Sequence, residues 1–344
     1  MKKLLITGGA GFIGANCAKY FYNQSYDITI IDNLSRNGAA LNINWLKNEK
    51  IKFHFYKLDI THKNKIDELI KNGQFDVILH LAAQVAVTTS IINPRCDFET
   101  NALGTLNLLE ALRKHSAHTI LLYSSTNKVY GKLENLKISE RNNKYELHKN
   151  ILGVSEDQPL SFYSPYGCSK GAADQYCLDY ARIYNLKTIV FRQSCIYGIR
   201  QFGIEDQGWV AWLLIAHLLG KQINIYGNGK QVRDLLYIDD LIQLYYLAIN
   251  NISKVAGQVF NIGGGKKNAL SVLQTLQIIE KLTKKKVYYN FSDWRSGDQK
   301  LFISSNIKAK KLLSWQPKTD YIRGLNLMYN WINKNIDTIR KVVG

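Results

Sequence analysis

Tyr166 and Lys170 stand four positions apart and could form an acid–base pair. Ser164 and Pro165 precede them, and these residue types are typical of a helix N-cap and first turn. Apolar residues recur at helical intervals as far as Ile183, so the phenol and the ammonium are predicted to share one helix face. We expect the ammonium to lower the pKa of Tyr166 from about 10 to about 7, a change of about 4 kcal/mol. The pair would then take a proton from a hydroxyl at neutral pH.

The same spacing occurs by chance on many exposed helices, so its meaning depends on the rest of the chain. Near the amino terminus, residues 4–7 and 28–31 form two short apolar runs that read as strands. Between them lie the glycine-rich stretch 8–14 and a helical stretch to about Asn23, and Asp32 follows the second strand. This order of strand, turn, helix, strand and acid predicts a dinucleotide-binding unit.

Each glycine of that turn has a distinct physical role. Gly8 permits a tight turn, Gly11 lets the backbone approach a pyrophosphate, and Gly14 allows close packing of helix on strand. The helix N-terminus then favours the anion. Asp32 can accept hydrogen bonds from an adenosine ribose and would repel a 2′-phosphate, which favours NAD, although the nearby Arg36 leaves NADP open.

The alternation of strands and helices continues through the first half of the chain. Strands are predicted at 53–58, 76–81, 118–123 and 188–192, and helices at 65–71, 96–114 and around Tyr166. We expect an α/β fold with a Rossmann-type, doubly wound parallel sheet, whose ligand lies beyond the carboxyl ends of the strands. The residues at those ends are therefore site candidates: Leu81, Ala82, Ala83, Gln84, Ser124, Ser125, Thr126 and the run from Arg192 to Tyr197.

Two regions depart from this pattern. Residues 132–163 are polar and are predicted to form a surface excursion or a lid. Beyond about residue 195 the sheet pattern weakens, with helices expected at 207–220 and 239–250, strands at 224–226 and 259–263, and two or three final helices. We therefore predict a Rossmann domain over residues 1–194 and a smaller substrate-binding lobe over 195–344, with interleaved segments.

The chain of 344 residues carries a net charge of +18, from 45 basic and 27 acidic residues. Nucleic-acid binding is one explanation, and an anionic nucleotide substrate with a lysine-rich solvated surface is another. The lysines are spread along the sequence, and the one dense cluster is Lys284–Lys286, with no zinc-finger or RNA-recognition signature. The second explanation is favoured, so no nucleic-acid partner is expected.

Cysteine usage and hydropathy indicate a cytoplasmic protein. The five cysteines are scattered without a Cys-x-x-Cys pair and are interpreted as free thiols, with no metal site: Cys17, Cys96, Cys168, Cys177 and Cys195. The apolar run at residues 4–6 is broken by Gly8 and Gly9, which is too early for a signal peptide. No segment reaches the roughly 18 apolar residues of a membrane span, so no membrane association is expected.

Taken together, the motifs resemble the extended short-chain dehydrogenases/reductases that act on nucleotide sugars. They are Thr7–Gly14, Asp59, Ser124–Thr126, Tyr166 with Lys170, and Gly227–Asp234. More narrowly, four stretches are similar to the CDP-paratose 2-epimerases, also called CDP-tyvelose epimerases: Tyr123–Gly131, Ser164–Tyr176, Arg200–Phe202 and Asp206–Val210. The resemblance implies an epimerase that inverts carbon 2 of a CDP-linked 3,6-dideoxyhexose with NAD bound throughout. It also implies a homo-oligomer, either a dimer or a tetramer.

The resemblance also implies roles for individual residues. Tyr166 would be the base, Lys170 would lower its pKa and hold the nicotinamide ribose, and Thr126 would bind the reacting hydroxyl. The implied cofactor-binding residues are Gly8, Gly11, Phe12, Ile13, Gly14, Asp32, Asn33, Ser35, Arg36, Asp59, Ile60, Leu81, Ala82, Ala83, Gln84, Asn101, Ser124, Tyr166 and Lys170. The implied substrate-binding residues are Thr126, Asn127, Gln207, Val210, Arg233, Arg295 and Asp298. For the two arginines, an exposed ion pair is the alternative.

Two departures bear on the reaction. In the nucleotide-sugar 4,6-dehydratases an Asp-Glu pair follows the threonine and removes water, whereas Asn127 and Lys128 follow Thr126 here. Neither can act as that carboxylic acid–base pair, so dehydration is disfavoured. Cys195 stands where many relatives have an asparagine, and we interpret it as a packing residue and not as a nucleophile. Epimerisation at carbon 4 of a UDP-hexose, an NAD(P)-dependent reductase and a nucleotide-binding sensor remain as alternatives.

Overall fold

The computed structural model describes residues 1–343, and the chain divides into two compact units. The first unit contains Met1–Val129, Ser164–Arg192 and Ile242–Phe260. The second contains Tyr130–Tyr163, Gln193–Leu241 and the described residues from Asn261 onward. Each unit is therefore assembled from three separate stretches of chain. The assignment of cofactor binding to residues 1–194 and of substrate binding to residues 195–344 stays a prediction.

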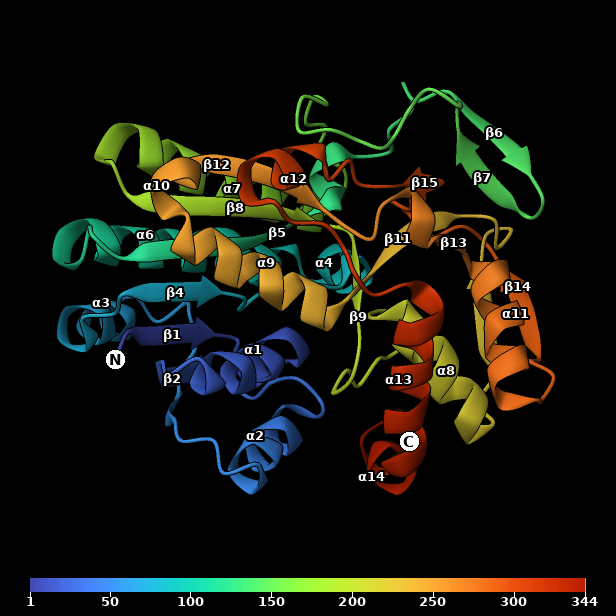
Figure 1. Ribbon diagram of the computed structural model, residues 1–344, viewed down its shortest axis with the longest axis horizontal. Helices are drawn as coiled ribbons and strands as arrows, with labels where there is room; N and C mark the ends of the chain where they lie inside the picture. The colour runs from blue at the N-terminus through green and yellow to red at the C-terminus, as the bar shows by residue number, and fades with distance from the viewer. Residues whose placement is uncertain (344) are drawn as a thin grey trace. The chain divides into compact units, whose positions relative to one another are not determined.

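A seven-stranded sheet forms the centre of the first unit, in the order β12-β8-β5-β4-β1-β2-β3 (Figure 1). Its strands are β1 (Lys3–Thr7), β2 (Asp27–Asp32), β3 (His54–Lys57), β4 (Val77–His80), β5 (Ile120–Thr126), β8 (Lys187–Gln193) and β12 (Gln258–Ile262). The strands β3, β2, β1, β4 and β5 pair in parallel. Strand order reverses at β1, between β2 and β4, which is the switch point of a doubly wound sheet. The predicted Rossmann-type α/β fold is thereby confirmed.

Helices connect these strands. They are α1 (Phe12–Asn23), α2 (Ala39–Asn48), α3 (Lys63–Gly73), α4 (Val87–Ile92), α5 (Pro94–Phe98), α6 (Gly104–His115), α7 (Pro165–Tyr184), α9 (Ile238–Asn250) and α10 (Ile252–Val255). The single helix predicted over 96–114 is wrong in detail, because a π-helical turn, Glu99–Leu103, separates α5 from α6. Helix α2 was not predicted: it begins after Gly38 in a left-handed conformation without a side-chain cap, so the usual start signal is missing.

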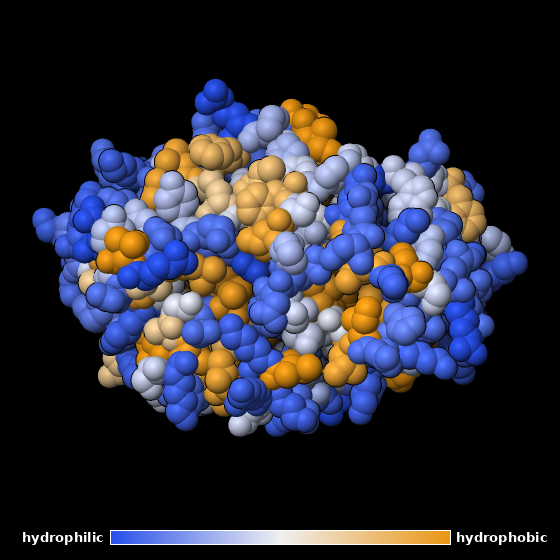
Figure 2. All heavy atoms as spheres, turned by 90° about the horizontal axis from the view of Figure 1, so that it is seen from above, coloured by the Kyte–Doolittle hydropathy of each residue, from blue (hydrophilic) through white to orange (hydrophobic). Residues whose placement is uncertain are grey.

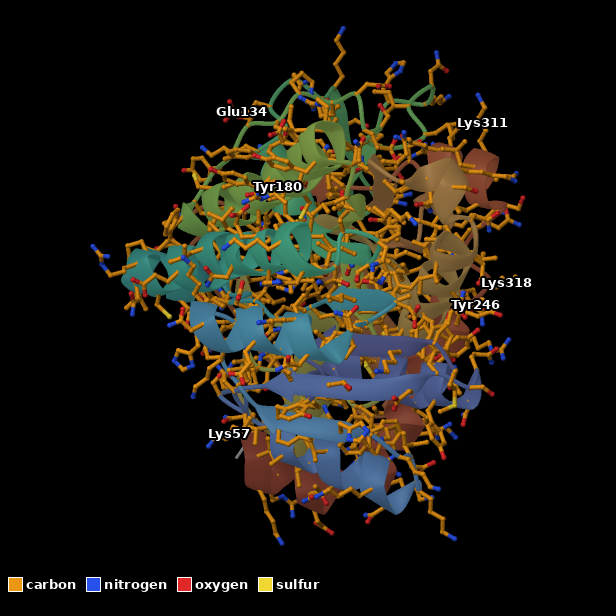
Figure 3. The ribbon with its side chains drawn as sticks, turned by 90° about the vertical axis from the view of Figure 1, so that its left-hand side faces the viewer. Lys57, Glu134, Tyr180, Tyr246, Lys311 and Lys318 are labelled. Atoms are coloured by element: carbon orange, nitrogen blue, oxygen red, sulfur yellow. The ribbon has the colours of Figure 1, made fainter. Side chains whose placement is uncertain are left out.

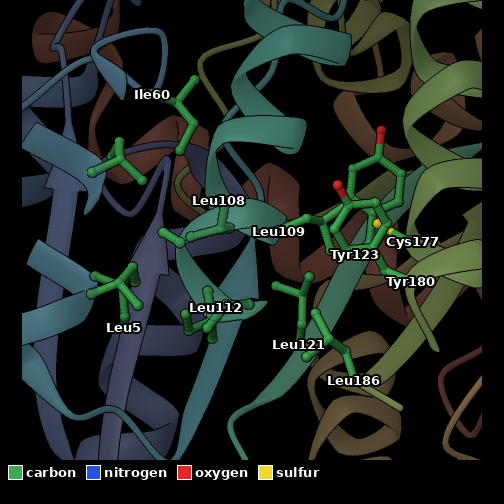
Figure 4. Close-up of a cluster of buried hydrophobic side chains, with 14 of the residues drawn as sticks. Leu5, Ile60, Leu108, Leu109, Leu112, Leu121, Tyr123, Cys177, Tyr180 and Leu186 are labelled. Carbon is green, nitrogen blue, oxygen red and sulfur yellow. The ribbon is translucent and has the colours of Figure 1, made fainter. Parts of the chain in front are cut away.

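One apolar cluster holds α3, α6 and α7 against the sheet (Figure 4). Leu5, Ile78 and Leu121 contribute from β1, β4 and β5, and each is completely buried. Leu108 and Cys177 meet them from α6 and α7. Burying a leucine or isoleucine side chain stabilises the fold by about 1.5–3 kcal/mol. This packing fixes α7, the helix that carries Tyr166, relative to the carboxyl ends of the strands.

Within residues 1–343, the second unit contains three smaller sheets. A four-stranded sheet is formed by β9 (Cys195–Tyr197), β11 (Val232–Tyr237), β13 (Ala269–Ser271) and β15 (Leu301–Phe302), and β10 (Ile223–Tyr226) pairs in parallel with β14 (Tyr289–Ser292). Its helices include α8 (Trp209–Leu219), α11 (Val272–Thr283), α12 (Ile307–Leu313), α13 (Tyr321–Lys334) and α14 (Ile336–Val343).

The segment predicted as a surface excursion contains a hairpin. Strands β6 (Ile138–Arg141) and β7 (Lys144–Leu147) pair antiparallel, and Asn142 and Asn143 make the turn with positive φ values of 49° and 60°. Tyr145 and Leu147 are buried in an apolar cluster with Val232, Leu301 and Ile303. The excursion is therefore partly packed into its unit, and a lid movement stays a prediction.

The surface carries the positive charge in dispersed form. The face drawn in Figure 2 is mostly hydrophilic with separate apolar patches. Lys57, at the end of β3, and Lys311 and Lys318, on and just after α12, are exposed and are labelled in Figure 3. None of the helices within residues 1–343 has the length and apolar composition needed to cross a membrane. The same residues contain no group of three or more histidines, cysteines or carboxylates arranged to hold a metal ion.

Candidate active site

The glycine-rich turn between β1 and α1 forms a tight backbone cradle. Gly8 has φ +67°, and a Cβ atom on it would lie 2.8 Å from the backbone nitrogen of Ala82. A Cβ on Gly14 would lie 2.5 Å from the carbonyl oxygen of Gly8. Gly11 is the N-cap of α1 and supplies no capping side chain, and no acidic residue stands in the first turn. The first-turn N–H groups are therefore suited to an anion such as a pyrophosphate.

Asp32 ends β2 and closes this turn from the other side. Its Oδ2 accepts a hydrogen bond from the backbone nitrogen of Ala10 at 3.0 Å, and its Oδ1 accepts one from Leu34 at 2.8 Å. Burial raises the pKa of Asp32, while these two N–H groups and the charge of Arg36 oppose the rise. A carboxylate offers about four lone-pair sites, so Asp32 can still accept two hydroxyl groups.

Asp59 lies just beyond β3 and is held by its neighbours. It accepts hydrogen bonds from the backbone and hydroxyl of Thr61, at 2.9 and 2.7 Å, and from the amide of Asn33 at 2.7 Å. Burial alone would raise the pKa of Asp59, but these hydrogen bonds outweigh it and hold the pKa below its usual value. Because β1, β2 and β3 are parallel, the glycine turn, Asp32 and Asp59 meet at one edge of the sheet.

A buried histidine, which the sequence analysis missed, orders the end of β4. His80 lies 2.7 Å from the hydroxyl of Thr7 and 2.9 Å from that of Thr105. Burial, helped by the charge of Lys170, lowers the pKa of His80 to about 3, so the ring is neutral. The hydroxyl of Thr7 also accepts the backbone N–H groups of Leu81 and Ala82, both at 3.1 Å. A lone His in an apolar strand gives no sequence signal that separates this role from simple packing.

The predicted cofactor residues Gln84 and Asn101 bind each other. The backbone nitrogen of Gln84 donates to Oδ1 of Asn101 at 2.9 Å, and Nδ2 of Asn101 donates to the carbonyl oxygen of Gln84 at 3.0 Å. Asn101 lies on the π-helical turn and also donates to Asp97 and Ser169, each at 3.1 Å. Asn101 thus links the loop after β4 to α5 and α7.

Helix α7 begins as the sequence predicts and delivers Tyr166 and Lys170 to the carboxyl end of β5. The hydroxyl of Ser164 accepts the backbone N–H of Gly167 at 3.2 Å, with Pro165 in the first turn. The hydroxyl of Thr126 lies near enough to the phenol of Tyr166 to lower its pKa. Tyr166, Lys170 and Thr126 are all buried, and Lys170 binds the carbonyl oxygen of Ser124, two residues before Thr126, so the structure brings the three predicted catalytic side chains together.

The prediction that the pKa of Tyr166 falls to about 7 is wrong for the protein without bound ligands. Burial raises the pKa to about 12, the charge of Asp97 acts in the same direction, and Thr126 and Arg36 lower it only in part. The ammonium of Lys170 donates to the carbonyl oxygen of Ser124 at 2.6 Å and does not contribute to the shift. Spacing along the helix correctly placed the two side chains but not the desolvation of the phenolate.

A buried ion pair between β8 and α7, which no sequence pattern predicted, supports the site. Arg192, the second-last residue of β8, donates to both carboxylate oxygens of Asp174 on α7, at 2.9 and 2.8 Å. The hydroxyl of Ser125 donates to the same carboxylate at 2.7 Å. The side chains of Arg192 and Asp174 are 4% and 0% exposed, so the loss of either would leave a buried charge without its partner.

The remaining predicted substrate residues belong to the second unit. Arg233 on β11 donates to Oδ1 of Asp298 at 2.8 Å and to the carbonyl oxygens of Val232 and Gln299 at 2.8 and 2.9 Å. Its side chain is only 12% exposed, which does not match the exposed ion pair considered as the alternative.

Arg295 lies over the ring of Tyr226, with its guanidinium carbon 3.7 Å from the ring centroid. It pairs with Asp206 at 2.9 Å and donates to the carbonyl oxygen of Glu205 at 3.2 Å. The hydroxyl of Tyr226 donates to the Glu205 side chain at 3.2 Å. The guanidinium plane is thus fixed on an aromatic face, which leaves its orientation well defined.

Three further residues of the second unit were singled out from the sequence. Gln207 forms a two-way backbone bridge with Ile204, at 3.0 Å in each direction, and Val210 is buried on α8. Burial raises the pKa of the Cys195 thiol to about 12, which agrees with its interpretation as a packing residue.

Comparison with known proteins agrees with this geometry. A model of the family described as GDP-mannose 4,6 dehydratase matches residues 5–328. The CDP-paratose 2-epimerase of Salmonella typhi is 46% identical over 334 residues, which cover 96% of this chain and 98% of that protein.

Solved structures show the same fold. A UDP-glucose 4-epimerase from Thermotoga maritima, crystallised with UDP-glucose, superposes with a TM-score of 0.84 at 30% identity and covers 97% of this chain and 99% of its own. A UDP-glucuronic acid 4-epimerase variant from Bacillus cereus, in complex with a fluorinated UDP-sugar and NAD, gives 0.82 at 28% identity, covering 96% and 99%.

The sheet order and the glycine turn define a Rossmann-type α/β protein with the layout of the short-chain dehydrogenases/reductases. Within that class, the chain belongs to the GDP-mannose 4,6 dehydratase family.

Proposed function

We propose that this protein is a nucleotide-sugar epimerase that uses tightly bound NAD and inverts carbon 2 of a CDP-linked deoxyhexose. The observation that carries the proposal is the joint burial of Tyr166, Thr126 and Lys170 at the carboxyl edge of the sheet, with the Lys170 ammonium bound to the carbonyl oxygen of Ser124. The high identity to a CDP-paratose 2-epimerase supports the choice of base, sugar and carbon.

The residues at that edge fit NAD. The backbone cradle leaves no room for a Cβ at Gly8, Gly9 or Gly14 and presents uncapped N–H groups, as a pyrophosphate requires. Asp32 and Asp59 carry carboxylates suited to the hydroxyl groups of an adenosine ribose, and a 2′-phosphate would meet their negative charge. When bound, NAD supplies a hydride acceptor and donor, and its positive nicotinamide charge would lower the pKa of Tyr166 from the value that burial imposes. The remaining residues of the cofactor set surround these three points and are proposed to complete the contact.

The residues of the chain then perform proton transfer and positioning. Thr126 holds a sugar hydroxyl next to the phenolic oxygen of Tyr166, which removes its proton as the carbon is oxidised to a ketone. After the ketone sugar rotates so that its other face is presented, Tyr166 returns the proton as the carbon is reduced from that face. Lys170 provides a positive charge in this buried place, and the charges of Arg233 and Arg295 are suited to the diphosphate.

Asn127 and Lys128 support epimerisation over dehydration, even though the family takes its description from a dehydratase. Removal of water across two carbons needs a carboxylic acid and a base where these two residues stand. Neither an amide nor an ammonium can fill both roles. A ketone formed at the Tyr166 site is therefore reduced again and does not lose water.

We also propose that the enzyme is a cytoplasmic homo-oligomer. Its five cysteines are free, as expected in a reducing compartment. Exposed apolar side chains on α5 and α7, among them Phe98, Tyr176 and Ile183, are candidates for contact between copies. Light scattering of the purified protein distinguishes a dimer or tetramer from a monomer.

Incubation of the purified protein with CDP-paratose and, separately, with UDP-glucose tests the function. Proton NMR should show conversion of CDP-paratose to CDP-tyvelose. Conversion of UDP-glucose alone would instead assign a UDP-hexose 4-epimerase. A net, stoichiometric change in reduced-nicotinamide absorbance during turnover would assign a reductase, because an epimerase returns its cofactor to the starting state.

A further inference from the structure

Asp97 on α5 is a completely buried carboxylate to which the mechanism above gives no role. Its Oδ1 accepts hydrogen bonds from the side-chain amides of Gln84 at 2.9 Å and Asn101 at 3.1 Å. Its Oδ2 accepts one from the hydroxyl of Ser169, the residue immediately before Lys170. Three donors converge on the two oxygens, which is the arrangement that stabilises the ionised form of a buried carboxyl.

The negative charge of Asp97 interacts electrostatically with the ammonium of Lys170. Burial raises the pKa of Asp97, while the hydrogen bonds from Ser169 and Gln84 and, less strongly, the charge of Lys170 oppose the rise. Within residues 1–343 no arginine or lysine forms a direct ion pair with Asp97. The interaction therefore acts through space, and the Ser169 hydroxyl holds the carboxylate in place.

Other groups near Lys170 do not replace Asp97. Cys177 is a neutral thiol because burial raises its pKa well above the ordinary value, and Tyr123 is a neutral phenol for the same reason. His80 is neutral as well, with its pKa lowered to about 3 by burial. Asp174 is the other carboxylate, but both of its oxygens already bind Arg192. Both carboxylates oppose the fall of the Lys170 pKa, and Asp97 is the one that is not already paired with an arginine.

We propose that Asp97 is the counter-ion of Lys170, a positioning residue that keeps this side chain an ammonium and sets the pH range in which Tyr166 works. This inference rests on the proposed roles of Tyr166 and Lys170. It adds a residue from α5 to the three already assigned. The π-helical turn that follows α5 places Asn101 where it donates to the same carboxylate, so the irregular helix serves to hold the counter-ion.

The direction of the effect follows from the charges. Burial lowers the pKa of Lys170 to about 8, and Asp174 and Asp97 oppose that fall. Removal of the Asp97 charge therefore lowers the pKa of Lys170 further. The same charge raises the pKa of Tyr166, so its removal lowers that pKa too, while Arg36 continues to act in the lowering direction. The acidic limb of the pH–activity profile, which Tyr166 sets, and the alkaline limb, which Lys170 sets, then both move to lower pH.

A purely structural role makes a different prediction. If Asp97 only ties α5 to α7, its replacement lowers activity at every pH and leaves both limbs in place. Ser169→Ala removes the tie while the carboxylate remains, so it separates the two roles. Asp97→Glu retains the charge in a longer side chain. Asp179→Asn on the exposed side of α7, where Asp179 pairs with Arg182, is a matched control for loss of a carboxylate.

The test measures kcat/KM against pH for the NAD-loaded wild type and these variants. For Asp97→Asn we expect both limbs to move down by about one pH unit, a tenfold change in the protonation ratio at fixed pH. Ser169→Ala, Asp97→Glu and Asp179→Asn should keep the wild-type limbs. Limbs of Asp97→Asn that coincide with the wild type, or an equal displacement in Ser169→Ala, would overturn the proposal. If Asp97→Asn does not fold, Asp97→Ser takes its place.

A second measurement does not depend on turnover. Protein labelled with ¹³C at the lysine ε-carbon is titrated by NMR, with Lys170→Arg used to assign the resonance. The Lys170 resonance should titrate about one unit lower in Asp97→Asn than in the wild type. An unchanged titration contradicts the counter-ion role. If the wild type epimerises no nucleotide sugar, the proposed function fails, and this titration still decides the role of Asp97.

Discussion

The ammonium of Lys170 donates to the carbonyl oxygen of Ser124 at 2.6 Å and lies 4.2 Å from the centroid of the Tyr123 ring. Lys170 is therefore fixed to β5 before any ligand binds. Its position on α7, one turn beyond Tyr166, keeps the positive charge in the same buried region without a direct bond between the two. Lys170 therefore provides a positive charge whose position is fixed before ligands bind.

Lys170→Met should lower kcat by about 10²- to 10⁴-fold, the usual loss when a group of an acid–base pair is removed. Methionine fills the volume of the side chain but provides neither the charge nor the bond to Ser124. Steady-state kinetics and thermal unfolding check this, with Lys187→Met at the exposed start of β8 as a control. A kcat within threefold of the wild type would remove Lys170 from the mechanism.

Gly14→Ala should abolish cofactor binding and destabilise the first unit. The new Cβ would lie 2.5 Å from both the carbonyl oxygen of Gly8 and the Cα of Gly9, so α1 must move away from β1. Overpacking of this kind costs about 1–3 kcal/mol. Urea unfolding and a fluorescence titration with NAD measure the two effects. Normal affinity for NAD in this variant would show that the turn is not the pyrophosphate site.

His80→Gln should make stability less dependent on pH. The folded-state pKa of His80, about 3, is depressed below the unfolded value of about 6.5, so its stabilising contribution is present above pH 6.5 and is lost as the pH falls. Between about pH 7.5 and pH 5 this loss amounts to about 2 kcal/mol in the wild type.

The free energy of unfolding, from urea curves at both pH values, checks this. The exposed His118→Gln should keep the wild-type difference. His80→Gln should show a difference smaller by about 2 kcal/mol. An equal difference in all three proteins would mean that His80 is protonated in the folded state.

Arg233→Lys should weaken substrate binding without slowing the chemical step. Lysine keeps the charge but lacks the planar fork that Arg233 presents between Asp298 and the carbonyl oxygens of Val232 and Gln299. Loss of one hydrogen bond to a charged group costs about 1.5–3 kcal/mol, so KM for the nucleotide sugar should rise at least about tenfold with kcat within twofold. Arg182→Lys on the exposed side of α7 should leave both constants unchanged. A lower kcat with unchanged KM would place Arg233 away from the nucleotide.

Much of the fold followed from local patterns in the sequence. The strands ending at Thr7 and Asp32, the close approach of Gly14 to Gly8, and the Ser164 cap all depend on neighbours within a few residues. The doubly wound sheet follows from the alternation of such elements.

What sequence reasoning missed depends on distant contacts. The pKa of Tyr166 is governed by burial and by Asp97, which lies 69 residues earlier in the chain. The pairing of Arg192 with Asp174 and the setting of His80 between Thr7 and Thr105 are likewise formed only when the sheet and helices pack. No spacing rule reports the depth at which a side chain is buried.

The most direct test of the account follows CDP-paratose by proton NMR in D₂O, with wild-type protein and with Tyr166→Phe. We predict that the wild type inverts carbon 2 and that the product keeps protium on that carbon, because the hydride removed from the sugar is the one returned. Tyr166→Phe should be slower by about 10²- to 10⁴-fold while it still binds NAD. Deuterium on carbon 2 of the product, or near-normal inversion by Tyr166→Phe, would contradict the account.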